Sequence, residues 1–104
     1  MITIVTETRQ YKKLIVGLVE GRHELPVDAY IYGEIQDVLD FDFLQKRANE
    51  FISQLSEGDS LVVYVTGLTA ATAAVITACM NRKVHLVLKH YDRETGSYKN
   101  QSLF

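Results

Sequence analysis

The residues best suited to chemistry lie where a predicted buried strand gives way to a predicted helix. This junction reads Val65-Thr66-Gly67-Leu68-Thr69. In open α/β sheets, ligands bind beyond the carboxyl ends of the strands, and a helix N-terminus there offers N–H groups and partial positive charge to phosphate. Gly67 would let a phosphate approach the backbone, and the hydroxyls of Thr66 and Thr69 would add donors. The structural alternative is that Gly67 only makes the turn and Thr69 only caps the helix.

A second group, Lys89-His90-Tyr91-Asp92-Arg93, ends the next predicted strand. If the two strands are parallel neighbours, this group reaches the same edge of the sheet as Gly67. Asp92 could bind a divalent cation or orient a base, His90 could move a proton near neutral pH, and Arg93 could bind phosphate. The alternative is that Asp92 shapes a hairpin turn and that His90 and Arg93 are solvated beside it.

A third group, Gly21-Arg22-His23-Glu24, is either a basic lip on the same pocket or, as we favour, a polar loop before Pro26. No dinucleotide fingerprint, phosphate-loop motif, HExxH pair or metal-spaced histidine cluster occurs in the sequence. Cys79 lies among apolar residues of a predicted helix, where a buried and inert thiol is expected.

Local patterns predict the elements that position these groups. Residues 61–65 form a continuous branched apolar run, typical of a strand buried on both faces, and 69–80 an alanine-rich helix packed on the sheet. Residues 41–55 have helical spacing, with Asp40 or Asp42 as N-cap and Gly58 as the stop. Residues 84–89 predict a strand, 92–97 a turn, and 98–103 an antiparallel edge strand.

The first forty residues are open to two interpretations. Ile2 to Val5 predicts a strand, and Leu14 to Val19 fits either a second strand or, together with Tyr11, a helix. We favour a hairpin with residues 7–10 as its turn, and a further short strand within 29–35. The expected fold is a small α/β domain over residues 1–104, Rossmann- or ferredoxin-like, with a mixed sheet, an antiparallel C-terminal hairpin and two packed helices.

Composition narrows the class of protein. The 104 residues suit one domain, and the single cysteine excludes an internal disulfide or a cysteine-based zinc site. The net charge of −2 argues against long duplex nucleic acid as a partner, because such binding depends on a basic face. No apolar run could span a membrane and no secretory signal is evident, so we expect a cytoplasmic protein.

Three stretches resemble a known family. They are Ile2–Val5 with Leu14–Val19, then Leu61–Gly67 with its following helix, and Val84–Asp92 with the Gly96 turn and the strand to Gln101. Together they are similar to small CRISPR-associated proteins related to the CARF (CRISPR-associated Rossmann fold) superfamily, and most of all to its compact stand-alone manganese-dependent ring nuclease family.

The resemblance implies binding of cyclic oligoadenylate, the second messenger of type III CRISPR defence, by a homodimer or larger homo-oligomer. Thr66, Gly67, Leu68 and Thr69 match the loop that meets phosphate, and Asp92 matches an aspartate linked to Mn²⁺ and phosphodiester cleavage. The histidine that the family has before its last core strand is missing, since Asn81-Arg82-Lys83 stands there. Cleavage would then need other groups.

The leading hypothesis is therefore a binder of a signalling nucleotide, with ring nuclease activity as an open question. In place of the missing histidine, Lys83 or Arg82 could stabilise phosphate charge and His90 could act as acid or base. The hypothesis places positive charge around the pocket from Arg22, His23, Lys89 and Arg93. A non-enzymatic oligomeric interaction module of a defence system is the alternative, and a mononucleotide-binding enzyme of another class is a third option.

Overall fold

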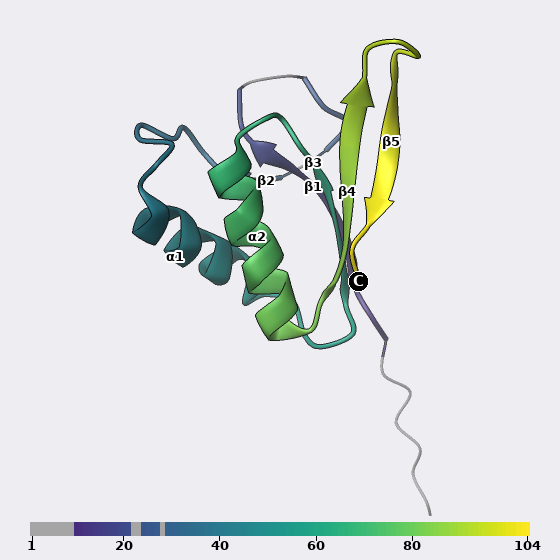
Figure 1. Cartoon of the computed structure of the whole chain (residues 1–104). Coiled ribbons are helices and arrows are strands. Elements are labelled where there is room, and N and C mark those ends of the chain that lie inside the picture. The colour runs from purple at the N-terminus through teal and green to yellow at the C-terminus, as the bar shows by residue number, and fades with distance from the viewer. Residues whose placement is uncertain (1–9, 22–23, 28) are drawn as a thin grey trace, which may run out of the picture.

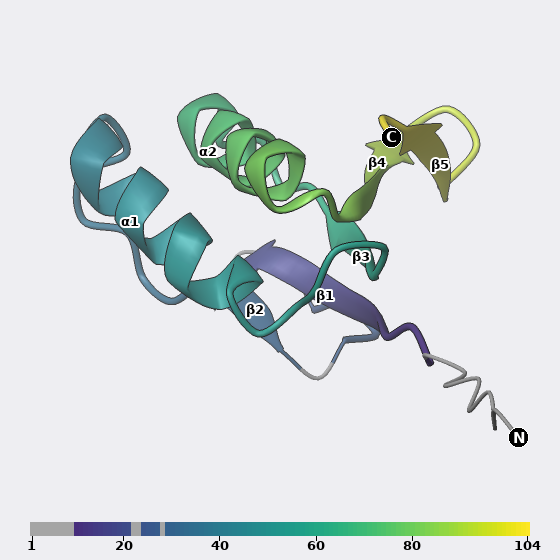
Figure 2. The same cartoon turned by 90° about the horizontal axis from the view of Figure 1, so that it is seen from below.

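The computed structural model describes residues 10–21, 24–27 and 29–104 of the chain. Within them, five strands form one sheet in the order β2-β1-β3-β4-β5. These strands are β1 (Lys13–Val19), β2 (Tyr30–Tyr32), β3 (Ser60–Tyr64), β4 (His85–Asp92) and β5 (Ser97–Ser102). The helices α1 (Phe41–Ile52) and α2 (Thr69–Arg82) both cover the same face of the sheet (Figures 1 and 2). The predicted α/β class, with a mixed sheet and two helices, is confirmed.

The strand pairing brings the carboxyl ends of β3 and β4 to the same edge of the sheet. β3 pairs in parallel with β1 on one side and with β4 on the other, whereas β4 and β5 form the expected antiparallel hairpin. Gly96 in the hairpin turn has a φ of +68°, a conformation that favours glycine. The hairpin rises beyond the end of β3 (Figure 1). It therefore forms a wall beside the turn that leads from β3 into α2.

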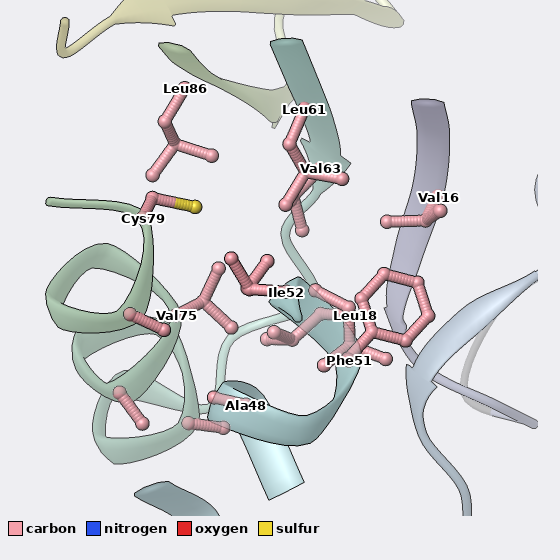
Figure 3. Packing of buried hydrophobic residues seen from close by; sticks show 14 of the residues in the cluster. Val16, Leu18, Ala48, Phe51, Ile52, Leu61, Val63, Val75, Cys79 and Leu86 are labelled. Atoms are coloured by element: carbon pink, nitrogen blue, oxygen red, sulfur yellow. The ribbon is translucent and has the colours of Figure 1, made fainter. Parts of the chain in front are cut away.

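The core lies between the sheet and the two helices (Figure 3). Alternate residues of the strands point into it, including Val16 and Leu18 of β1 and Leu61 and Val63 of β3. The face of α2 that meets them is built mostly from small residues, which allow the helix to approach the sheet closely; its buried residues are Ala71, Ala74, Val75, Ala78 and Cys79. No described helix is long and apolar enough to cross a lipid bilayer.

The N-terminal part of the fold decides between the two interpretations of residues 11–19. Lys13–Val19 is a strand, so the helical alternative is wrong. The proposed hairpin partner, Ile2–Val5, lies outside the described residues, and the described neighbours of β1 both run parallel to it. The expected strand within 29–35 forms only over Tyr30–Tyr32.

The first helix has the predicted start but an earlier end. Asp40 is its N-cap, with the carboxylate accepting a hydrogen bond from Phe43 N at 3.1 Å. The helix stops at Ile52 with Ser53 as C-cap, whereas the prediction extended it to Leu55 and the Gly58 stop. Residues 53–55 continue as turns, so the periodic apolar pattern outlasts the helix by one turn.

Gly17 allows the chain between β1 and β2 to pack on the sheet face opposite the helices. Its neighbours Val16 and Leu18 point toward the helices, so a side chain at position 17 would point the other way. There the ring of Tyr30 and the side chain of Leu25 lie against the glycine. A Cβ at this position would come within 2.5 Å of two ring carbons of Tyr30 and 3.2 Å of a Leu25 methyl.

We expect Gly17→Ala to lower the free energy of unfolding by about 1–3 kcal/mol, the usual cost of forcing extra atoms into a packed site. Gly33→Ala is the matched control, because no heavy atom lies within 4 Å of its added Cβ. That variant should stay within about 0.5 kcal/mol of the parent. Urea denaturation of the three proteins measures both values, and equal losses at the two positions would contradict the packing described.

Candidate functional site

A cleft of about 720 Å³ opens where the β3–α2 turn, the start of α2 and the end of β4 meet. The turn contributes Thr66 and Gly67, and α2 contributes its first residue, Thr69. The opposite wall is formed by His90 and Tyr91 of β4 and by Arg93, just after that strand. The structure thus brings together members of both groups that the sequence suggested, from segments more than twenty residues apart.

The turn leaves the helix N-terminus open toward this cleft. Gly67 has a φ of +97°, which strains other residues, and no heavy atom lies within 4 Å of a Cβ built on it. The N-cap of α2 is Leu68, whose side chain cannot accept the first N–H groups, and the helix has no side-chain cap bond. The structural alternative that Thr69 caps the helix is therefore wrong, since Thr69 is the first helical residue.

Thr66 carries a buried hydroxyl with an unusual environment. Its Oγ1 is shielded from solvent and has no hydrogen-bond partner among the described residues. A buried polar atom without a partner costs free energy, and in native proteins such atoms often occur at functional sites. Thr66 is among the residues that line the cleft, although its hydroxyl is turned away from solvent.

Two polar side chains on the β4 side of the cleft, His90 and Arg93, could contact a ligand. His90 lies on the helix-covered side of the sheet, and its Nε2 is 2.8 Å from Oε1 of Gln101 on β5. If Nε2 donates this bond, Nδ1 of the neutral ring is left as an acceptor. Arg93 has no carboxylate within salt-bridge distance among the described residues. Its guanidinium is exposed and can bind an anion.

Three lining residues on α2 were not singled out by the sequence, namely Thr72, Ala73 and Ile76. Together with Val65 they add apolar surface to the cleft. Thr72, Ala73 and Ile76 follow Thr69 at intervals of three, four and seven residues, which is the spacing of one helix face. The helical period therefore contains a signal that could have identified them.

Asp92 takes part in the hairpin turn and does not line the cleft. Its Oδ1 accepts a hydrogen bond from Glu94 N at 3.0 Å, and its Oδ2 accepts one from Thr95 Oγ1 at 3.1 Å. Gly96 N also donates to its carbonyl oxygen at 2.8 Å. Among the described residues there is no group of three His, Cys, Asp or Glu side chains that could share a metal ion. The carboxylate thus fits the turn and, standing alone, does not fit a manganese site.

Lys89 and Lys83 are also placed away from the cleft. Lys89 lies on the face of the sheet opposite the helices, where its Nζ donates to Asn100 Oδ1 at 2.9 Å and lies 5.6 Å from the centre of the Tyr64 ring. Lys83 is the C-cap of α2, at the far end of the helix from the cleft, and its Nζ lies 3.9 Å from a carboxylate oxygen of Glu57. Neither lysine can touch a ligand in the cleft.

Three predicted ligand-binding residues remain: Leu68, Arg22 and His23. Leu68 is half-buried and packs against the core, so its side chain does not line the cleft. Arg22 and His23 lie outside the described residues.

The expected inert character of Cys79 agrees with its surroundings, because the side chain is fully buried and burial raises the thiol pKa to about 12.

Burial likewise raises the pKa of the Tyr32 phenol to about 12, although the nearby positive charge of Arg47 opposes this shift. The phenol stays protonated and donates to the Leu44 carbonyl at 2.6 Å, fixing β2 to α1 away from the cleft.

The chain matches no family model, and it has no significant similarity to a curated protein or to a solved structure. Its function must therefore be inferred from the cleft itself.

Proposed function

We propose that the cleft binds a phosphorylated nucleotide, and that cyclic oligoadenylate is the ligand to test first. The observation that carries this proposal is the meeting of an uncapped helix N-terminus with Arg93 across a single cleft. The N–H groups of the first helical turn and the guanidinium are both suited to phosphate oxygens. The choice of cyclic oligoadenylate rests on the resemblance to CARF-related proteins.

The charge around the cleft supports an anionic ligand in spite of the net charge of −2. No aspartate or glutamate is found in its described lining, so Arg93 supplies the net charge there. Thr69 adds a hydroxyl donor close to the turn. Attraction of phosphate depends on these local groups, because the more distant charges are screened by salt.

The shape and polarity of the cleft fit a nucleoside as well as its phosphate. Its volume lies within the usual range for small-molecule sites, about 300–1,000 Å³. Val65, Ala73 and Ile76 provide apolar surface against which an adenine or ribose ring can pack. A nucleotide whose phosphate lies at the N-terminus of α2 and whose base lies along that helix would contact both the polar end and the apolar surface of the cleft.

The proposal concerns binding of the nucleotide, and cleavage of its phosphodiester bonds would depend on a single residue of the cleft, His90. Of the three candidate catalytic residues, only His90 lines the cleft, whereas Asp92 and Lys83 do not. His90 could accept a proton from a ribose 2′-hydroxyl through Nδ1 while Gln101 holds Nε2. We include a cytoplasmic homodimer in the proposal, since a two-fold axis would offer the same donors to repeated phosphates of a ring.

The test is the affinity for cyclic tetra-adenylate and cyclic hexa-adenylate, measured by calorimetry with the linear oligoadenylates as comparison. We expect Arg93→Ala to weaken binding by about tenfold or more, since bonds to charged groups contribute about 1.5–3 kcal/mol. Lys83→Ala is the matched control, because it removes the same charge at the other end of α2. It should change affinity less than about twofold.

Two results would overturn the proposal. One is that neither ring binds at micromolar protein concentrations. The other is that Arg93→Ala and Lys83→Ala weaken binding equally, because that would show a general effect of charge in place of a contact in the cleft. Product analysis of the same samples, with His90→Gln as the comparison, measures whether bound rings are also opened.

A further inference from the structure

The sheet face opposite the helices is a second surface with a distinctive composition. We call it the open face and define it by the strand residues whose side chains point away from the helices. They are Lys13, Ile15, Gly17, Ser60, Val62, Tyr64, His85, Val87, Lys89, Tyr91, Tyr98, Asn100 and Ser102. Figure 2 shows both helices on the other side of the strands. On this side, Leu25 of the β1–β2 connection and Tyr30 of β2 lie against Gly17.

Three tyrosines gather at the hairpin end of the open face. The rings of Tyr64 and Tyr98 meet edge to face with centroids 4.7 Å apart, and Tyr91 lies 5.4 Å from Tyr98. Tyr91 is 56% exposed, so much of its ring faces solvent. Lys89 lies among them, with Nζ 5.6 Å from the Tyr64 ring centroid. Aromatic surface and a positive charge are thus within reach of one ligand.

The charge of the open face has one sign. None of its strand positions holds aspartate or glutamate, whereas Lys13 and Lys89 contribute two positive charges. This contrasts with the net charge of −2 of the whole chain. Acidic residues are found around α1, for example Asp40, Asp42 and Glu50, and in the turns at the ends of the strands, for example Asp92 and Glu94.

We infer that the open face binds single-stranded nucleic acid, with bases against the tyrosines and phosphates at Lys89 and Lys13. Proteins that bind single strands combine aromatic rings, on which bases stack, with positive groups that follow the backbone. A duplex would not fit this surface, since its bases are already stacked. The inference shares Tyr91 with the cleft, because this residue near the end of β4 also lines the cleft, whereas the other residues of the open face do not line it.

Charge also distinguishes this ligand from a second copy of the chain. Two open faces packed together would bring lysines of both copies into one interface without a carboxylate at any strand position to neutralise them. Like charges in such a position disfavour association. A polyanion has the opposite effect, because it neutralises the lysines and releases its own counterions.

The test uses fluorescein-labelled twelve-residue oligouridine and oligothymidine, with binding followed by anisotropy at several salt concentrations. We expect Lys89→Glu to weaken binding by about tenfold or more and to reduce the salt dependence. Lys46→Glu is the matched control, because it gives the same net charge at an exposed position on α1. Its affinity should stay within about threefold of the parent, as expected for a distant screened charge.

The aromatic part is tested at Tyr98, which does not line the cleft. Tyr98→Leu should lose about tenfold in affinity, and Tyr98→Phe, which keeps the ring, should lose less than about twofold. Thermal unfolding of each variant confirms that it is folded. Absence of binding by the parent protein, equal losses for Lys89→Glu and Lys46→Glu, or a self-association that Lys89→Glu abolishes would each overturn the inference.

Discussion

Replacing Asp59 by alanine is expected to lower the free energy of unfolding by about 2–4 kcal/mol. The side chain is only 2% exposed although it is charged. Its Oδ1 accepts a hydrogen bond from Lys12 N at 2.9 Å, and its Oδ2 accepts one from Ser56 N at 2.7 Å. Alanine would leave both backbone donors without these bonds, in a place that water reaches poorly.

The expected effect is large because the Asp59 side chain connects the turn after α1 to the start of β1, 47 residues away in sequence, whereas its bond to β4 is made by the main chain and is kept in the alanine variant. Its side chain holds the start of β1 and the turn after α1, while its carbonyl oxygen accepts a bond from His85 N at 2.8 Å at the start of β4. Loss of the carboxylate therefore weakens the edge of the sheet opposite the cleft. Interactions that close long stretches of chain act on the whole cooperative unit.

Asp37→Ala is the matched control for this prediction. Asp37 makes the same kind of bond, from Leu39 N to its Oδ1 at 2.9 Å, but on the exposed surface. Water can replace the acceptor there, so we expect a loss below about 1 kcal/mol. Urea denaturation at neutral pH measures both variants, and a loss for Asp59→Ala no larger than that for Asp37→Ala would contradict the structural role of the buried carboxylate.

The main layout of the cleft could be predicted because its signals are local. A branched apolar run at 61–65, a glycine and an alanine-rich segment indicate a strand, a turn and a helix without knowledge of the rest of the chain. A helix that connects two neighbouring parallel strands places their carboxyl ends at the same edge. The meeting of Gly67 with His90 and Arg93 follows from these two facts.

The same topology excludes Lys83 from the cleft. α2 has 14 residues and is about 21 Å long, and it runs back toward the start of the sheet. A residue that follows its last turn must therefore lie at the opposite edge from Thr69. The displacement of Lys83 could have been predicted from the helix length alone.

Alternation along β4 explains the position of Lys89. Leu86 and Leu88 point toward the helices, so the side chain of His90 lies on the helix-covered face of the sheet and that of Lys89 lies on the opposite face.

The position of Asp92 was harder to predict, because an aspartate at a strand end suits both a ligand site and a turn. Its bonds to Glu94 and Thr95 satisfy the carboxylate within four residues, and local turn bonds of this kind compete well with distant partners.

Tertiary packing determined the features that local patterns could not predict. Asp59 looks like an ordinary turn carboxylate in the sequence, and its burial depends on three segments that meet only in the folded chain. β2 is limited to Tyr30–Tyr32 because it has register partners only at Gly17 and Val19 of β1.

Filling the cleft should abolish ligand binding if the cleft is the binding site. Ala73 is exposed on α2 and lines the cleft, so Ala73→Trp would place an indole in the space proposed for the base. We expect the affinity for cyclic oligoadenylate to fall by about a hundredfold, which corresponds to about 2.7 kcal/mol. Helix stability should change little, because the position faces solvent.

Thr77→Trp provides the matched control for Ala73→Trp. Position 77 lies one turn further along α2, is also exposed, and is not part of the cleft lining. The same indole there should leave the affinity within about twofold of the parent, with both variants unfolding at similar temperatures. If Ala73→Trp bound the rings as tightly as Thr77→Trp does, the ligand would have to sit elsewhere, because an indole and a nucleoside cannot occupy the same space beside Ile76.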